Sequence, residues 1–411
     1  MGKILLQWHF KKKQCELMDA MKYHDKCETI REAMEKMNEI IQNQLLETQE
    51  NKSKSDNLPE GCVPMEIENA IKDFKDMAEK IVMNETDIEN SISRFNIDQS
   101  NIFKKITSVL QSNDKILRIF ISGPGGTGKS FLIETIVAWN KIIRNKETAV
   151  TAPTGIAAYN VSGLTIHRLL HLPVEHGCTA KYKELSPAAL KQIRQSLENV
   201  DLIIIDEISM VSNITLMYIH LRLTEIFNTS ECDDGWFGKI HIIVFGDLLQ
   251  LPPVRENFAF VEVAKKDIEK YIGAINSFNL WTLFEYDELT INMRQKNDNQ
   301  YNEILSRLRL GFLTDIDINV LQQRTLKFSS TNSLEIMQEL CAVYEKLPTD
   351  TVCLLPTRNM CDILNDAMLR RIDSEDINLI ANDSFKCPKN LQKKVLKMLD
   401  EDKDMLVELS A

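Results

Sequence analysis

Glycine, close cysteine pairs and long apolar runs are all scarce in this chain of 411 residues. Its nine cysteines are scattered without a Cys-x-x-Cys pair, which disfavours a zinc cluster or a disulfide framework and favours reduced thiols. The N-terminus has a short apolar stretch followed at once by lysines, so it does not resemble a secretory signal. No apolar run approaches the roughly 20 residues that span a bilayer. We therefore expect an intracellular protein, in the nucleus or another compartment, that is neither secreted nor membrane-bound.

An excess of positive charge is also missing from the chain as a whole. The formal net charge is −11 at pH 7, which by itself disfavours a nucleic-acid partner. The charge is uneven, however, because residues 101–200 hold 13 basic and 6 acidic side chains, whereas residues 201–300 hold 8 and 16. A basic segment inside an acidic chain leaves nucleic-acid binding open.

The sequence pattern divides the chain into three regions, which we place at 1–92, 93–300 and 301–411. The first region is charged and favours helices, with a polar linker at 51–61 between helical stretches over 13–50 and 64–82. The second alternates short apolar runs with helical stretches, which predicts a parallel sheet covered on both faces. Its expected strands are 116–122, 149–152, 202–205 and 240–245, and its expected helices are 129–144, 187–198 and 214–227. Within the third region, an expected strand at 351–355 and an expected helix over 360–372 indicate the opening of another α/β domain, and the region ends in a charged helical tail.

Four of the 14 glycines lie between Gly123 and Gly128. They belong to the sequence GPGGTGKS, a full Gly-x-x-x-x-Gly-Lys-Ser pattern directly after an expected strand and directly before an expected helix. The backbone N–H groups of such a loop hold phosphate oxygens, its lysine reaches the β and γ phosphates, and its serine supplies an oxygen to Mg²⁺. We therefore expect ATP and Mg²⁺ as cofactors. The predicted nucleotide-binding residues are Gly123, Pro124, Gly125, Gly126, Thr127, Gly128, Lys129 and Ser130, with Ser130 also at the metal.

Two further polar groups follow expected strands. Asp206 and Glu207 come directly after the apolar run at 202–205, and we assign Asp206 to the magnesium shell and Glu207 to the orientation of a water. Gln250 follows the strand at 240–245 and is suited to sensing the γ phosphate. From spacing alone, an ordinary loop glutamine is the better interpretation of Gln250.

Five motifs in order resemble the Pif-type (petite integration frequency) family of superfamily-one DNA helicases, subgroup 1B. They are TAPTGIAA at 151–158, GLTIH at 163–167, DEISM at 206–210, GDLLQLPP at 246–253 and LTINMRQ at 289–295. A later stretch, TRNMCDILN at 357–365, resembles members associated with Helitron-like transposons. The resemblance covers about residues 95–365.

The resemblance implies several residue roles that spacing alone does not give. Gln99, in the sequence NIDQ, is similar to a glutamine that reads the adenine ring. Arg294 matches an arginine that reaches the γ phosphate, so it joins Lys129, Glu207 and Gln250 among the predicted catalytic residues. The positions that match DNA-contacting residues of the family are Thr154, Gly155, Thr165 and His167. Trp281 is expected in the core rather than in a base-stacking platform.

The resemblance also implies an α/β fold with RecA-like P-loop NTPase domains, and movement along single-stranded DNA in the 5′ to 3′ direction. The implied partners are single-stranded DNA and a duplex with a 5′ single-stranded tail. No later stretch resembles the family's remaining motifs, so we expect a second RecA-like domain that is only partial. Two functions stay open: an ATP-dependent DNA helicase, or a non-catalytic remnant that binds ATP and single-stranded DNA without unwinding. A P-loop ATPase unrelated to DNA leaves the motifs at 151–158 and 163–167 unexplained.

Overall fold

The computed structural model describes residues 65–79, 83–174, 180–271, 279–294, 298–329, 333–344, 346–348, 351–355 and 357–369. The chain divides into two compact units, Met1–Ile318 and Asn319–Ala411. The helices expected over 13–50, the linker at 51–61 and the charged tail lie outside the described residues. None of the described helices is long and apolar enough to span a membrane.

The first unit is built on a six-stranded sheet with the order β3-β2-β4-β5-β1-β6, in which every neighbouring pair is parallel. This confirms the predicted parallel sheet. The strands are β1 (Arg118–Ser122), β2 (Glu147–Ala152), β3 (Leu164–Thr165), β4 (Val200–Ile205), β5 (His241–Gly246) and β6 (Glu285–Glu288). Ser122 of β1 pairs with Gly246 of β5 and Glu288 of β6, so the loops that follow these strands leave from one edge of the sheet.

The two strands that the sequence did not reveal are the edge strands β3 and β6. β3 is only two residues long, and β6 has the sequence EYDE with half-buried side chains. β3 is too short to show a continuous apolar run, and the partly exposed side chains of β6 do not require the apolar residues that predict a buried central strand.

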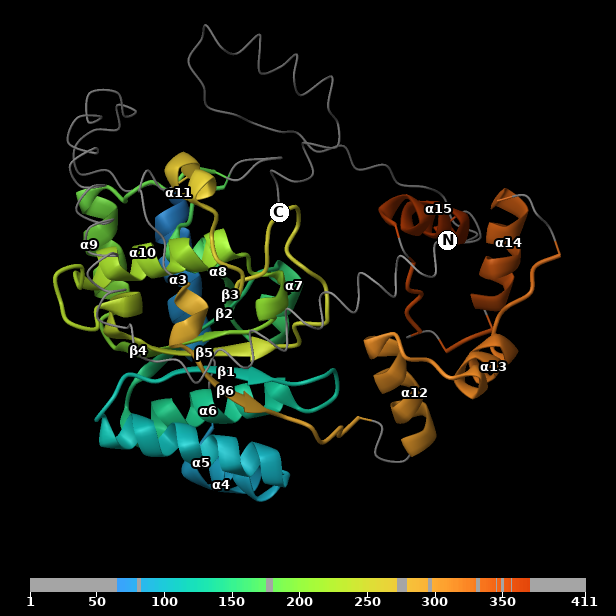
Figure 1. Ribbon diagram of the computed structural model, residues 1–411, viewed down its shortest axis with the longest axis horizontal. Helices are drawn as coiled ribbons and strands as arrows, with labels where there is room; N and C mark the ends of the chain where they lie inside the picture. Colours follow the sequence, from blue (N-terminus) through green and yellow to red (C-terminus); the bar gives the residue numbers. More distant parts are fainter. Residues whose placement is uncertain are drawn as a thin grey trace, which may run out of the picture. The chain divides into compact units, whose positions relative to one another are not determined.

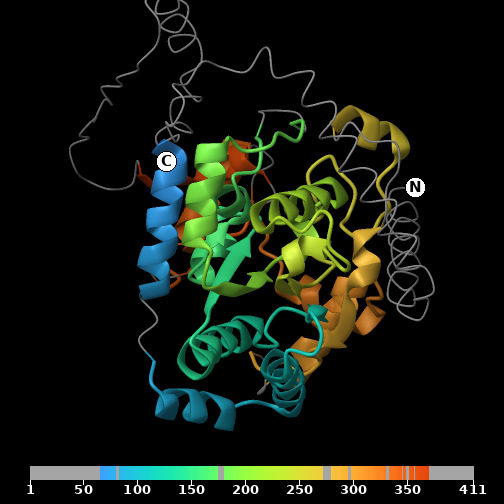
Figure 2. The same ribbon diagram turned by 90° about the vertical axis from the view of Figure 1, so that its left-hand side faces the viewer.

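Helices cover both faces of the sheet, as Figure 1 shows. One face packs against α3 (Met65–Glu79), α8 (Ile166–Leu170), α9 (Pro187–Ser196) and α10 (Asn213–Phe227), and the other against α4 (Glu85–Ser93), α5 (Ile97–Ser112) and α6 (Lys129–Arg144). β4 serves both cores, because Ile203 and Ile205 point into the first while Leu202 and Ile204 point into the second. The turned view shows α3 lying alongside α9 (Figure 2), so this part of the N-terminal region packs on the parallel sheet.

The remaining elements of the first unit are short or lie near its C-terminal end. They are α7 (Gly155–Asn160), η2 (Ile208–Met210), η3 (Trp236–Lys239), α11 (Lys265–Tyr271), η4 (Leu280–Leu283) and α12 (Asn299–Leu310). Trp281 in η4 is buried against Phe120 with ring centroids 5.0 Å apart, which confirms its expected core position.

The second unit differs from the expectation. Residues 351–355 form no strand: Val352 and Leu354 are 77% and 89% exposed. An apolar run becomes a strand only where a neighbouring strand accepts its backbone hydrogen bonds, and none lies among the described residues of this unit. The described helices here are α14 (Ser333–Tyr344) and α15 (Arg358–Leu369), while α13 (Asp315–Gln323) crosses from the first unit. The helix expected over 360–372 is thus confirmed as far as Leu369, and the prediction of a strand at 351–355 is wrong.

Candidate active site

The phosphate loop joins β1 to α6, as its sequence predicts. Gly126 and Gly128 have positive φ angles of 89° and 80°, which glycine adopts without strain. Lys129 begins α6 and its Nζ donates to the carbonyl oxygens of Gly123 and Pro124 at 2.7 and 3.3 Å. Ser130 is exposed in the first turn of the same helix, and a Cβ atom placed on Gly125 would meet open space. The loop thus combines a glycine turn, a helix N-terminus, one ammonium and one exposed hydroxyl. These are the groups that bind a nucleoside triphosphate with its metal ion.

The side chain of Gln99 hydrogen-bonds the backbone of the phosphate loop. It is the N3 residue of α5 and is fully buried, and its Oε1 accepts from the Asn96 N–H at 3.1 Å in a capping box. Its Nε2 donates to the carbonyl oxygens of Thr127 and Gly128 at 3.2 and 3.4 Å. The structure therefore places this amide against the loop backbone, and contact with an adenine ring would require it to leave these partners.

The segment that carries Arg294 lies directly on the phosphate loop. The Met293 N–H donates to the Gly126 carbonyl at 2.7 Å, and Asn292 Nδ2 donates to the Gly125 carbonyl at 3.4 Å. A Cβ atom on Gly126 would come within 2.9 Å of Cβ of Arg294. The structure thus brings together Arg294 and the loop that is predicted to hold the phosphates.

Asp98, in the first turn of α5, hydrogen-bonds two residues of the segment that leads to Arg294. Its carboxylate accepts from the Thr290 N–H and the Thr290 hydroxyl, both at 2.8 Å, and from the Ile291 N–H at 3.3 Å. Burial acts to raise the pKa of Asp98, but these hydrogen bonds outweigh it and lower the pKa below its ordinary value. Sequence reasoning missed both Asp98 and Asn292, although each lies inside a stretch that it had singled out.

The two carboxylates at the end of β4 lie where the sequence predicts. Asp206 is buried, and its Oδ1 accepts from the Glu207 N–H at 2.9 Å. Burial raises the pKa of Asp206, and the charge of Lys129 opposes this rise. Burial, together with the negative charge of Asp206, also raises the pKa of Glu207, whose backbone is left-handed with φ of 53°. Lys129 acts on both carboxylates, so one ammonium serves the phosphate loop and the end of β4.

The residues that the sequence predicts to hold Mg²⁺ are Ser130 and Asp206. Among the described residues there is no group of three or more histidine, cysteine or acidic side chains that could hold a metal alone. One hydroxyl and one carboxylate suit Mg²⁺ that is shared with nucleotide phosphates, because this ion commonly takes only one or two protein ligands.

The loop after β5 carries Gln250, which is exposed, and Asp247, which is buried. The Gln250 N–H donates to the Asp247 carbonyl at 2.8 Å, and the Leu249 N–H donates to Asp247 Oδ1 at 3.1 Å. Asp247 also pairs with Arg309 of α12, a residue that sequence reasoning did not identify.

The predicted DNA-contacting residues follow β2 and β3. Thr154 and Thr165 are the N-caps of α7 and α8, where their hydroxyls accept from the N–H groups of Ala157 and Arg168 at 3.2 and 3.3 Å. Gly155 is exposed in the first turn of α7. His167 is half-buried, and burial lowers its pKa while the charge of Glu256 opposes this shift.

The sheet order arranges these groups along one edge. The candidate DNA residues follow β2 and β3, the phosphate loop follows β1, and β4 and β5 lie between them. The ends of β4 and β5 carry Asp206, Glu207, Asp247 and Gln250. Ligands of open parallel sheets bind at this carboxyl edge, so Asp206, Glu207 and Gln250 follow strands that lie between the phosphate loop and the candidate DNA-contacting residues.

The parallel sheet, the phosphate loop and the carboxylates after β4 define a P-loop nucleotide-binding domain of the RecA-like type. Residues 94–315 match the model of a family described as PIF1-like helicase. This match covers more than half of the 411 residues, and the chain belongs to the PIF1-like helicase family.

Similar proteins include named helicases. The chain is 27% identical over 300 residues to the ATP-dependent DNA helicase PIF1 of Emericella nidulans, covering 70% of this chain and 34% of that protein. It is 30% identical over 206 residues to the ATP-dependent DNA helicase RRM3 of Saccharomyces cerevisiae, covering 50% and 26%. The crystal structure of Pif1 helicase from Candida albicans superposes with a TM-score of 0.52 at 22% identity, covering 74% of this chain and 60% of that one, which supports the fold. The chain thus spans about a third or less of the length of these two curated relatives.

Proposed function

We propose that this protein is an ATP-dependent DNA helicase that couples ATP hydrolysis to 5′ to 3′ movement along single-stranded DNA. Membership of the PIF1-like family supports this proposal. The observation that supports it most strongly is the contact between the phosphate loop and the Arg294 segment, through the Met293 N–H and the Gly126 carbonyl at 2.7 Å. A loop that only turned the chain would not require a distant arginine to be fixed beside it.

The proposed hydrolysis uses groups from four loops. Lys129 contacts the β and γ phosphates in place of the loop carbonyls, and Ser130 and Asp206 would hold Mg²⁺, which would supply positive charge to the phosphates. Glu207 orients the attacking water, and its raised pKa makes it a better proton acceptor than an ordinary carboxylate. Gln250 contacts the γ phosphate, and Arg294 stabilises the charge of the transition state. Gln99 is the proposed contact to adenine, and in this structure its side chain also hydrogen-bonds the backbone of the phosphate loop.

The proposed DNA surface is formed by Thr154, Gly155, Thr165 and His167. The first turns of α7 and α8 contain backbone N–H groups that have no partner within their helix, and such groups suit phosphate oxygens without regard to base sequence. His167 stays neutral near pH 7 because burial lowers its pKa, so it contributes a hydrogen bond rather than a charge. Tyr159, which is exposed on α7, is available for stacking on a base.

A strand-displacement assay tests this function. We expect the 411-residue chain to unwind a duplex with a 5′ single-stranded tail, to leave a duplex with a 3′ tail intact, and to lose both unwinding and ATP hydrolysis in Lys129→Ala. ATP hydrolysis that single-stranded DNA does not stimulate would contradict the DNA-linked part of the proposal.

One observation favours a second candidate, a protein that binds ATP and single-stranded DNA without unwinding. The described residues of the unit Asn319–Ala411 contain helices and no strand, whereas a second RecA-like domain requires a sheet. Nucleotide binding that depends on Lys129, together with single-stranded DNA binding and no displacement of either duplex, would identify this second function.

A further inference from the structure

The buried carboxylate of Asp247 is paired with an arginine from outside the recognised motifs. Asp247 directly follows Gly246, the last residue of β5, and its side chain is 1% exposed. Arg309 Nε donates to Asp247 Oδ2 at 2.8 Å, and Arg309 Nη2 donates to Oδ1. A carboxylate this deeply buried needs such a partner, because an unpaired charge in a protein interior is strongly destabilising. A planar guanidinium that bonds both oxygens also fixes the orientation of the carboxylate.

That orientation controls the loop that carries Gln250. Asp247 accepts through Oδ1 from the Leu249 N–H at 3.1 Å and through its backbone carbonyl from the Gln250 N–H at 2.8 Å. The turn is therefore built on Asp247, and Arg309 holds Asp247 in place. Among the described residues Arg309 makes no hydrogen bond to the phosphate loop, so it acts through Asp247.

The same helix, α12, also contacts Asn292, which hydrogen-bonds the phosphate loop. Asn302 of α12 accepts through Oδ1 from Asn292 Nδ2 at 2.9 Å, and this Nδ2 also donates to the Gly125 carbonyl at 3.4 Å. Asn302 and Arg309 are about two helical turns apart and so lie on one face of α12. One helix face thus contacts both the support of the phosphate loop and the base of the Gln250 loop.

We propose that Arg309 is a positioning residue of the ATP site, and that α12 fixes the position of the Gln250 loop relative to the phosphate loop. The catalytic consequence rests on the proposed ATP hydrolysis, whereas the positioning itself does not. Loss of the Arg309 pair frees the loop at 246–254, so Gln250 spends less time facing the γ phosphate. Turnover then falls while nucleotide affinity, which the phosphate loop supplies, stays nearly unchanged.

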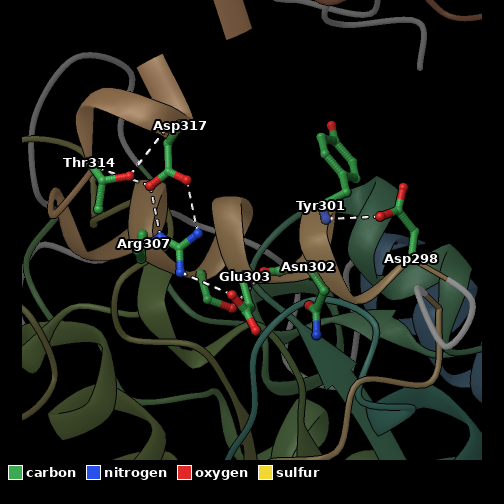
Figure 3. A network of polar contacts seen from close by, with 8 residues as sticks. Asp298, Tyr301, Asn302, Glu303, Arg307, Thr314 and Asp317 are labelled. Carbon is green, nitrogen blue, oxygen red and sulfur yellow. Dashed lines mark hydrogen bonds and ion pairs between the residues drawn. The ribbon is translucent and has the colours of Figure 1, made fainter. Parts of the chain in front are cut away.

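Arg307 provides a matched control on the same helix. Its Nε and Nη2 donate to the two oxygens of Asp317 at 2.7 and 2.8 Å, as Figure 3 shows. The Asp317 side chain is 3% exposed, and the two arginines are equally accessible at 34% for Arg307 and 30% for Arg309. Asp317 caps the turn at Thr314, and in Figure 3 Asn302 points away from this pair. Arg307 therefore makes the same kind of ion pair without contacting an ATP motif.

Hydrogen–deuterium exchange of the full chain tests the positioning without requiring catalysis. In Arg309→Gln we expect amide exchange in the peptide 246–254 to accelerate at least about tenfold, since a hydrogen bond to a charged group is lost. In Arg307→Gln the same peptide should exchange as in the wild type. Unchanged exchange in Arg309→Gln, or equal acceleration in both variants, would overturn the proposal.

Lysine variants keep the test decisive if Arg309→Gln does not fold. Arg309→Lys retains the charge beside Asp247 but not the planar fork, so we expect exchange of 246–254 to rise about threefold, and Arg307→Lys to leave it unchanged. Equal exchange in the two lysine variants would refute the assignment.

A kinetic readout connects positioning to turnover. We expect Arg309→Gln to lower kcat for ATP about tenfold or more with KM changed less than about twofold, and Arg309→Lys to recover part of the loss. A parallel change in KM, or the same loss in Arg307→Gln, would contradict the positioning role. A wild-type chain that hydrolyses no ATP would refute the proposed function, whereas the exchange measurement would still decide the role of Arg309.

Discussion

Replacing Gly128 by alanine perturbs the contact between the phosphate loop and Gln99 at a defined point. A Cβ atom at Gly128 would lie 2.4 Å from Gln99 Nε2, which is shorter than non-bonded contacts of Cβ atoms in proteins. Gly128 also has a φ of +80°, which alanine adopts only at a cost. The clash is with the end of a side chain, so Gln99 moves and its bonds to the Thr127 and Gly128 carbonyls break.

The expected magnitude follows from these two effects. The left-handed backbone costs about 1–2 kcal/mol for a residue with a Cβ atom. The two lost hydrogen bonds cost about 1 kcal/mol each. We therefore expect Gly128→Ala to lower the free energy of unfolding of this unit by about 3–4 kcal/mol. Gly125→Ala is the matched control, because a Cβ atom there meets nothing within 4 Å and the φ angle is not in the left-handed region.

Urea unfolding followed by tryptophan fluorescence measures this difference. Trp139 lies in α6, which starts at the phosphate loop, and Trp236 and Trp281 are buried in the same unit. In a Gln99→Ala background the clash and the two hydrogen bonds are already gone, so Gly128→Ala should cost only about 1–2 kcal/mol. An equal cost in both backgrounds, or a cost no larger than that of Gly125→Ala, would refute the proposed packing of Gln99 on the loop.

Three other changes have clear expected outcomes. Lys129→Ala should lower ATP turnover at least about a hundredfold and lower the free energy of unfolding by only about 2 kcal/mol or less, because its ammonium donates to the Gly123 and Pro124 carbonyls and offsets the charges of Asp206 and Glu207; a larger loss of stability would contradict this. Asp98→Ala should lower kcat about tenfold by freeing the Arg294 segment, and Asp98→Asn, which keeps one acceptor, should recover part of it. Burial, with a smaller contribution from the charge of Arg118, lowers the pKa of His220 to about 3, so the folded state binds fewer protons than the unfolded state at acidic pH. Stability should therefore be complete above about pH 6.5 and fall by up to about 1.4 kcal/mol per pH unit below it, and His220→Gln should flatten this slope in denaturation curves between pH 4.5 and 7.

The phosphate loop and the strands around it could be predicted because their signals are local. Glycines at 123, 125, 126 and 128 followed by Lys129 define a turn whose conformation depends on its own residues. The buried central strands β1, β4 and β5 need apolar side chains on both faces, so each contains a run of three or four consecutive apolar residues. The edge strand β6 gave no such signal, since it is held by its pairing with β1 and not by burial of its side chains.

The strand expected at 351–355 shows the opposite case. Its residues TVCLL have the composition of a strand, but Leu354 is exposed and no strand lies beside it among the described residues. Composition sets a preference, whereas a sheet requires a second segment to complete the hydrogen bonds.

By itself, the sequence determined the parallel α/β architecture, the phosphate loop, the carboxylates Asp206 and Glu207, and the resemblance that the family match at 94–315 confirmed. Only the tertiary structure decided that Gln99 braces the loop, that Asp98 and Asn292 fasten the Arg294 segment, and that Arg309 pairs with Asp247. Each of these contacts joins segments far apart in the chain. A local pattern cannot encode such contacts, because a hydrogen bond depends on where the folded backbone places its donor and acceptor and not on the residues beside them in the sequence.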